Sequence, residues 1–157
     1  KYFSHIQSVI LESKEVMIAI INDLASKADM VLPGTTEGLI LMGSENPDEI
    51  ADFYLNLGVK TVIIKLGCQG AYVKTEKESY IVEGFHVEKV IDTVGAGDGF
   101  AVGVISGRLE GLPLKECVRR GNAIGAIQVQ HISDNEGLPT IEELDIFISS
   151  NGKIINK

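Results

Sequence analysis

A strongly marked helix that leads directly into an apolar strand constrains the fold of this chain more than any other feature. Asn46 is a favoured N-cap residue, Pro47 suits the first helical position, and Gly58 ends the predicted helix. Glu49 is spaced to complete a capping box. The segment 61–64, Thr-Val-Ile-Ile, follows at once and is apolar on both faces. Because such strands are typical of parallel sheets covered by helices, this junction favours an α/β fold.

Helices and strands alternate along the rest of the chain. The apolar periodicity predicts further helices over 14–27, 35–42, 99–110, 113–129 and 141–149. Short apolar runs predict strands over 29–32, 71–73, 79–83 and 86–91. Ser13 is available to cap the first helix, and Thr140 with Glu143 forms a capping box at the last. We expect a mostly parallel sheet with an antiparallel extension, in a single domain.

Composition excludes several classes of function. The formal net charge of −8 argues against a nucleic-acid partner, because binding phosphates requires a basic face. No stretch reaches the roughly 18 apolar residues of a membrane span, and no signal-peptide pattern opens the chain. Cys68 and Cys117 stand far apart with no Cys or His at ligand spacing, which favours buried, reduced thiols. We therefore expect a cytoplasmic protein without a membrane or nucleic-acid partner.

The segment 92–99, Asp-Thr-Val-Gly-Ala-Gly-Asp-Gly, carries the strongest functional signal. Gly95 and Gly97 let the backbone turn tightly and approach a ligand. The N-terminus of the helix that follows offers unpaired N–H groups and its positive dipole end to an anion. Asp98 stands there too, where a carboxylate can face a hydroxyl that attacks a phosphate. A tight turn with a capping aspartate is the alternative. A dinucleotide fingerprint is excluded because it needs Gly where Phe100 stands.

The segment 92–99 resembles the Asp-Thr-x-Gly-Ala-Gly-Asp motif of the ribokinase-like carbohydrate kinases, with every position matched. The resemblance extends over about residues 29–149. It includes 65–71, Lys-Leu-Gly-Cys-Gln-Gly-Ala, similar to the family's Lys-x-Gly-x-x-Gly turn beside the nucleotide. Asn122 matches a residue of the adenine pocket. The implied fold is the C-terminal part of a three-layer α/β/α fold of the ribokinase type, so residues 1–157 would form a single partial domain.

Within this family, the segments 82–107 and 134–139 are most similar to 2-keto-3-deoxygluconate kinases, with a fructokinase- or ribokinase-like relative as the alternative. The resemblance implies ATP-dependent phosphorylation of a sugar or sugar acid, with Asp98 as the general base. The backbone of Gly95, Ala96 and Gly97 would form the anion hole. The implied ATP contacts are Thr35, Lys65, Leu66, Gly67, Cys68, Gln69, Gly70, Ala71, Asn122 and residues 95–98.

The resemblance also implies metal and substrate contacts. Glu37 matches the acidic member of an Asn-x-x-Glu motif that tunes Mg²⁺ through water, although Gly34 replaces the Asn; an ordinary exposed helix residue is the alternative. The backbone carbonyls of Asp92 and Thr93 would hold a monovalent cation such as K⁺. Asp134 matches a substrate-contacting acid of the sugar-acid kinases, and a simple turn residue is its alternative.

The chain departs from the family by lacking its N-terminal half, which supplies the lid and most sugar contacts. His5–Ile6–Gln7 stands where sugar-acid kinases carry Asn-Ile-Arg, and Gln cannot form the ion pair of an Arg. We therefore expect no phosphorylation of free sugar by this chain alone. An unpaired sheet edge near Val31 or 62–64 predicts a homo-oligomer. The alternatives are a nucleotide-binding module or a dimerising relic, both without phosphotransfer.

Overall fold

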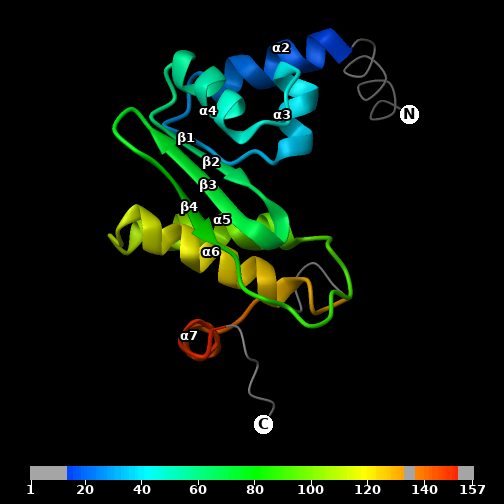
Figure 1. The fold of residues 1–157 in the computed structure, drawn as a ribbon, viewed down its shortest axis with the longest axis vertical. Helices are drawn as coiled ribbons and strands as arrows, with labels where there is room; N and C mark the ends of the chain where they lie inside the picture. Colours follow the sequence, from blue (N-terminus) through cyan, green and yellow to red (C-terminus); the bar gives the residue numbers. More distant parts are fainter. Residues whose placement is uncertain (1–13, 133–136, 152–157) are drawn as a thin grey trace, which may run out of the picture. The chain divides into compact units, whose positions relative to one another are not determined.

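The computed structural model describes residues 14–132 and 137–151 (Figure 1). The elements are α2 (Lys14–Ala25), β1 (Met30–Val31), α3 (Thr35–Met42), α4 (Pro47–Asn56), β2 (Thr61–Lys65), a 3₁₀ turn η1 (Gly67–Gln69), β3 (Gly70–Thr75), β4 (Ser79–Glu83), α5 (Ala96–Leu109), α6 (Leu114–Gln128) and α7 (Ile141–Ser149). They group into a first unit, Lys1–Ile64 with Val73–Ser79, and a second unit, Lys65–Tyr72 with Tyr80–Lys157. None of the helices in the described ranges is long and apolar enough to cross a membrane.

The strands form one sheet in the order β1-β2-β3-β4. β1 and β2 are parallel, with Met30 opposite Thr61 and Val31 opposite Val62. The connections from β2 to β3 and from β3 to β4 are too short for a parallel crossover, so these neighbouring pairs are antiparallel. The α/β class and the antiparallel extension are confirmed. The parallel part of the described sheet is one short pair, so this sheet is mixed.

The junction between α4 and β2 follows the sequence closely. The Asn46 side chain accepts a hydrogen bond from the Asp48 N–H at 2.9 Å, and Pro47 is the first helical residue. Glu49 does not complete the predicted capping box, because its carboxylate accepts the hydroxyl proton of Ser44 instead. β2 is buried on both faces, as predicted, and its fully buried residues are Val62, Ile63 and Ile64.

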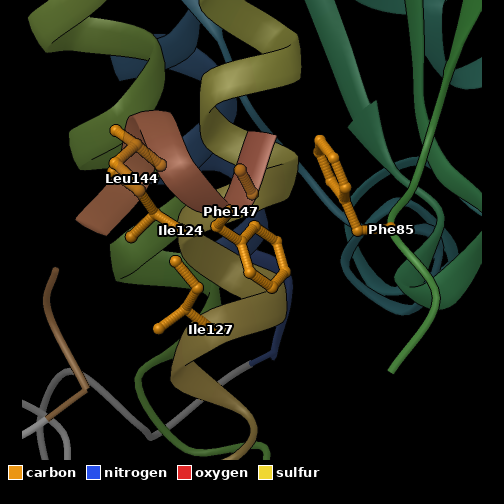
Figure 2. Packing of buried hydrophobic residues seen from close by; sticks show 6 residues of the cluster. Phe85, Ile124, Ile127, Leu144 and Phe147 are labelled. Carbon is orange, nitrogen blue, oxygen red and sulfur yellow. The ribbon is translucent and has the colours of Figure 1, made fainter. Parts of the chain in front are cut away.

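In the second unit, α5 and α6 pack with their backbones almost in contact. A Cβ added to Gly103 would lie 2.6 Å from the Gly121 Cα, and one added to Gly107 would lie 3.0 Å from the Cys117 Sγ. Since real Cβ atoms do not approach backbone as closely as 2.6 Å, glycine is required at position 103, and the space at position 107 is tight. Figure 2 shows the adjoining core, formed by Phe85, Ala123, Ile124, Ile127, Leu144 and Phe147.

The predicted capping box at α7 is confirmed. The Thr140 N–H donates to the Glu143 carboxylate at 2.9 Å, and the Glu143 N–H donates to the Thr140 hydroxyl at 3.3 Å. Ser13, the predicted cap of α2, lies outside the described residues.

Two predictions around the functional segment were wrong. Residues 86–91 form no strand, because the N–H groups of Ile91 and Asp92 bond to the Val129 carbonyl at the end of α6, at 2.7 and 3.3 Å. The helix predicted from residue 99 starts at Ala96. Gly95 takes a left-handed φ of 77° as its N-cap, and Gly99 already donates to the Gly95 carbonyl at 2.8 Å. The predicted loop residues 96–98 are therefore the first turn of α5.

Candidate active site

A cavity of about 740 Å³ lies within the second unit. Its volume is in the range of roughly 300–1,000 Å³ that small-molecule sites occupy. Four segments form its wall: the turn after β2, the segment after β4, the first turn of α5 with the loop before it, and α6. The lining residues are Lys65, Gly67, Cys68, Gly70, Gly84, Phe85, His86, Val87, Val90, Thr93, Ala96, Gly97, Phe100, Asn122, Gly125, Ala126 and Val129.

The first turn of α5 presents hydrogen-bond donors at this cavity. Among the described residues, the N–H groups of Gly97 and Asp98 have no acceptor, as expected for the first turn of a helix. The Lys65 ammonium lies at the same place, since a Cβ added to Gly97 would be 3.4 Å from its Nζ. Open N–H groups, the positive end of the helix dipole and a lysine therefore converge on one point. This arrangement can bind a polyanion such as a chain of phosphates.

Asp98 is exposed in that first turn, and its carboxylate forms no hydrogen bond or ion pair with another described residue. It does not line the cavity itself, although its neighbour Gly97 does. Asp98 is therefore accessible to solvent beside the anion site, and its role as general base stays a prediction.

The loop before α5 is held by its own hydrogen bonds. The Asp92 carboxylate accepts the Val94 N–H at 3.0 Å, which closes a tight turn. The Thr93 carbonyl accepts the Ala96 N–H at 3.4 Å, a long and weak bond. The Asp92 side chain thus has a structural role. Binding of a monovalent cation by the carbonyls of Asp92 and Thr93 stays a prediction.

Glycines are required in the turn at 65–71. Gly67 and Gly70 have φ angles of 60° and 100°. A Cβ on Gly70 would lie 2.1 Å from the Val82 carbonyl oxygen, and the Gly84 N–H donates to the Gln69 carbonyl at 3.2 Å. The turn is therefore packed backbone to backbone against the segment after β4.

Only some of the residues predicted in this turn face the cavity. Lys65, Gly67, Cys68 and Gly70 line it, whereas Leu66, Gln69 and Ala71 do not. Ala71 is fully buried in β3. The predicted burial of Cys68 was wrong, because its side chain is exposed at the cavity, but Cys117 is buried as expected.

Asn122 lines the cavity from α6 and is 8% exposed. Its Nδ2 donates to the carbonyl oxygens of Val82 and Glu83 at 3.0 and 3.1 Å. Because both partners are acceptors, the amide orientation is fixed by the hydrogen bonds. Asn122 therefore anchors the end of β4, and its remaining hydrogen-bonding capacity is the acceptor Oδ1.

Sequence reasoning missed much of the apolar wall. Residues 84–90 were predicted largely as a strand, which would have used their backbone in a sheet rather than around a cavity. Gly84, directly after a strand, was an overlooked signal for a close backbone approach; a Cβ there would lie 2.5 Å from the Cys68 carbonyl oxygen. The other missed residues are Phe85, His86, Val87, Val90, Phe100, Gly125, Ala126 and Val129.

Two predicted site residues, Thr35 and Glu37, belong to the first unit, where α3 begins. The Glu37 carboxylate accepts the Gly34 N–H and so caps this helix. Burial, followed by the negative charge of Glu37, raises the pKa of Tyr54.

Asp134 lies outside the described residues. In the described part of the chain, no three Asp, Glu, His or Cys residues cluster as metal ligands. A nucleotide-bound Mg²⁺ would not require such a cluster, because this ion is usually held by one or two carboxylates together with substrate phosphates and water.

Comparisons with known proteins find similar sequences among the carbohydrate kinases. The pfkB family carbohydrate kinase profile matches residues 5–141. The chain is 54% identical over 141 residues to the 2-dehydro-3-deoxygluconokinase of Bacillus subtilis (strain 168), covering 90% of this chain and 44% of that one.

Among solved structures, a PfkB protein from Polaromonas sp. JS666 is 50% identical with a TM-score of 0.73, covering 85% of this chain and 41% of that chain. A putative ribokinase II of E. coli in complex with ATP and Mg²⁺ is 29% identical with a TM-score of 0.79, covering 91% and 45%. The chain thus spans less than half the length of these relatives. The match over residues 5–141 shows that this chain belongs to the pfkB family of carbohydrate kinases.

Proposed function

We propose that this chain forms the ATP-binding and general-base part of a kinase that phosphorylates a sugar acid of the 2-keto-3-deoxygluconate type. One observation carries the proposal: the open N–H groups of Gly97 and Asp98 and the Lys65 ammonium meet beside a cavity large enough for a nucleotide. The ATP and Mg²⁺ bound to the E. coli structure, at a TM-score of 0.79, support the same ligand here.

The cavity lining suggests how ATP lies in it. Lys65 and the first turn of α5 supply positive charge and hydrogen-bond donors, which suit the phosphates. Phe85, Ala126 and Val129 supply apolar surface, which suits the base and ribose. In this arrangement the γ-phosphate lies at the end of the site where Asp98 is exposed. Thr35 is proposed as a further nucleotide contact from the first unit.

Phosphoryl transfer then requires little covalent chemistry from the protein. Asp98 accepts the proton of the acceptor hydroxyl as that oxygen attacks the γ-phosphorus, and ADP leaves with the bridging oxygen. The N–H groups of Ala96, Gly97 and Asp98 stabilise the charge that develops on the transferred group.

We also propose roles for two bound cations and a contact between one acidic residue and the sugar acid. When bound, Mg²⁺ neutralises phosphate charge, with Glu37 contributing through water, and the carbonyls of Asp92 and Thr93 hold K⁺. Asp134 is proposed to contact the sugar acid.

The acceptor is proposed from similarity. The 54% identity to a 2-dehydro-3-deoxygluconokinase supports a sugar acid as the acceptor. The name 2-dehydro-3-deoxygluconate denotes the same compound as 2-keto-3-deoxygluconate. Fructose and ribose are the alternatives, the latter supported by the putative ribokinase. Since the chain spans 44% of the Bacillus relative, we propose that its 157 residues alone bind nucleotide without turning over free sugar. Positioning of the acceptor contributes up to roughly 7–11 kcal/mol, and a partial site forgoes much of it.

A titration and a turnover assay test this proposal together. Mg·ADP should raise the melting temperature of the chain in a dose-dependent way, because a ligand that binds the folded state stabilises it. Coupled ADP release with 2-keto-3-deoxygluconate, fructose or ribose should stay far below about 1 s⁻¹, the low end for kinases. An unchanged melting temperature of a folded sample at millimolar Mg·ADP would refute the nucleotide site. Turnover near 1 s⁻¹ would refute the inactivity of the chain alone.

We also propose that the chain self-associates. β1 is an edge strand of the described sheet, and α2 exposes Val16, Ile20 and Leu24 on its surface. Edge strands and contiguous apolar surface both recruit partners. Light scattering at micromolar concentration should therefore report a mass above that of a monomer, and a stable monomer would contradict this part of the proposal.

A further inference from the structure

Two residues that belong to no sequence motif, Arg119 and Phe147, pack against an aromatic side chain in the cavity wall. Phe85 lines the cavity and is 7% exposed. The guanidinium carbon of Arg119 on α6 lies 5.6 Å from the centroid of its ring. The ring of Phe147 on α7 lies 5.2 Å away, centroid to centroid, tilted by 48° (Figure 2). Both distances are within the range of favourable cation–π and aromatic contacts.

The cation–π contact with the Phe85 ring best explains the position of the Arg119 guanidinium. Its Nε is buried without a hydrogen-bond partner in the described residues, a costly state for such a donor. The adjacent Arg120 behaves in the usual way and forms a two-pronged pair with Glu110, at 2.7 and 2.9 Å. Arg119 is only partly buried, but the burial of its Nε reduces screening by water, which strengthens a cation–π contact with the ring that it faces.

Arg119 and Asn122 are three residues apart, so they project from the same side of α6. Asn122 holds the backbone at Val82 and Glu83 through two hydrogen bonds, and Arg119 holds the ring of Phe85. One face of α6 therefore fixes the segment 82–85 at its backbone and at its aromatic side chain. This segment forms one wall of the cavity.

We propose that Arg119 is a positioning residue that holds Phe85, backed by Phe147, as the surface against which the nucleotide base packs. The inference rests on the proposed ATP site and adds the residues that set its affinity for the base. Arg119 touches no reacting atom. It acts through Phe85, whose ring orientation it fixes, and the phosphates are bound separately by Lys65 and the first turn of α5.

The test compares ligands that contain a base with one that does not. Wild type, Arg119→Met and Arg120→Met are titrated with Mg·ADP, with adenosine and with Mg-pyrophosphate. Arg119→Met keeps an unbranched apolar stem and removes the charged group, so its affinity for ADP and for adenosine should fall by the same factor. A desolvated cation–π contact corresponds to about 5- to 30-fold. Pyrophosphate affinity should stay within about 2-fold, since phosphate binding is local to α5.

Arg120→Met is the matched control, because it removes the same charge from the next position on α6 and breaks only the pair with Glu110. It should leave the ratio of ADP to pyrophosphate affinity unchanged. Phe85→Leu should lower ADP and adenosine affinity, and adding Arg119→Met to it should cause no further loss, since coupled residues are not additive. Arg119→Lys, which retains the charge, should fall between wild type and Arg119→Met and replaces it should that variant not fold.

The outcomes separate this inference from the function on which it rests. A wild-type chain that binds none of the three ligands refutes the nucleotide site and the inference with it. A wild-type chain that binds ADP, with Arg119→Met equal to wild type or weakened equally for ADP and pyrophosphate, overturns the role of Arg119 alone.

Discussion

Two helices, α2 in the first unit and α6 in the second, use their apolar residues in opposite ways. In the first unit, α2 buries none of its residues, and the side chains of Val16, Ile20 and Leu24 are at least half exposed. In the second unit, α6 is buried along most of its length, and α5 approaches it so closely that glycines line the crossing. The crossing of α5 and α6 is therefore closely packed and can support a rigid site, although α5 also exposes Val102, Ile105 and Leu109.

The two units also differ in whether the polar groups at their cavities already have hydrogen-bond partners within the protein. The first unit also has a cavity, of about 400 Å³, whose lining is largely apolar. Its polar members are already engaged: Glu37 caps α3, and the Tyr54 hydroxyl donates to Asn22 at 3.4 Å. In the second unit the N–H groups of Gly97 and Asp98 are open. We therefore expect ligand binding to depend on the second unit and the first to contribute stability and contacts.

The largest effect is expected at Asp98 of the second unit. In the catalytically active protein, Asp98→Asn keeps the size of the side chain and removes the base, so kcat should fall by at least roughly 100-fold. ATP affinity should change little, because the N–H groups that bind phosphate are retained. A coupled ADP-release assay measures both quantities. Near-normal turnover would mean that Asp98 merely caps α5 and that another residue is the base.

A second large effect concerns the packing of α5 on α6. Gly103→Ala places a methyl group 2.6 Å from the Gly121 backbone, which has no side chain that can move aside. We expect the free energy of unfolding to fall by about 1–3 kcal/mol, as for other overpacked cores. Gly97→Ala is the control, since its added Cβ meets only the Lys65 ammonium at 3.4 Å. Urea unfolding that ranks the two variants equally would contradict the close crossing.

The two thiols offer a smaller, graded test of the cavity. Cys68 is exposed at the cavity and should react quickly with a thiol reagent, whereas Cys117 is buried. Burial raises the pKa of the Cys117 thiol, so less thiolate is present near neutral pH and its reaction should be slow and accelerate as pH rises. Mg·ADP should slow the fast phase, and Cys68→Ser should abolish it. Labelling of Cys68 that is indifferent to Mg·ADP would place the nucleotide elsewhere.

The smallest expected effect lies in the first unit. Lys74 contacts Asp48 and Asp52 at 2.7 and 2.6 Å, and these hydrogen bonds raise its pKa. The stabilisation is therefore complete at neutral pH and is lost as pH rises above about 10.4, the ordinary lysine value. Lys74→Met should lower the free energy of unfolding by about 0.5–1 kcal/mol at pH 7. Lys60→Met, which breaks the exposed pair with Asp29, should have no measurable effect.

Local chemistry explains which parts of the fold could be predicted. Asn46–Pro47 and Thr140 define helix starts through their own side chains, so α4 and α7 were placed correctly. The strand predicted over 86–91 does not form, because backbone N–H groups at its C-terminal end donate to the carbonyl of Val129, almost 40 positions away. No local sequence pattern indicates such a contact. The early start of α5 depends on the left-handed Gly95, which a sequence marks only as flexible.

The same distinction holds for the site. The segments 65–71 and 92–99 carry recognisable motifs, and much of each lies at the cavity. Phe85 and Arg119 belong to no motif, because their role arises only when α6 packs beside the end of β4. The predicted roles of Thr35, Glu37 and Asp134 stay predictions, and the last of these lies outside the described residues.

Mapping of amide shifts on titration with Mg·ADP tests the central claim most directly. A chain of 157 residues is small enough for each backbone amide to be followed. We expect the largest shifts at Gly67, Phe85, Gly97 and Asp98 and at the Asn122 side chain, with the amides of α2 and α4 nearly unchanged. No shift at millimolar Mg·ADP in a folded sample, or shifts centred on the cavity of the first unit, would contradict it.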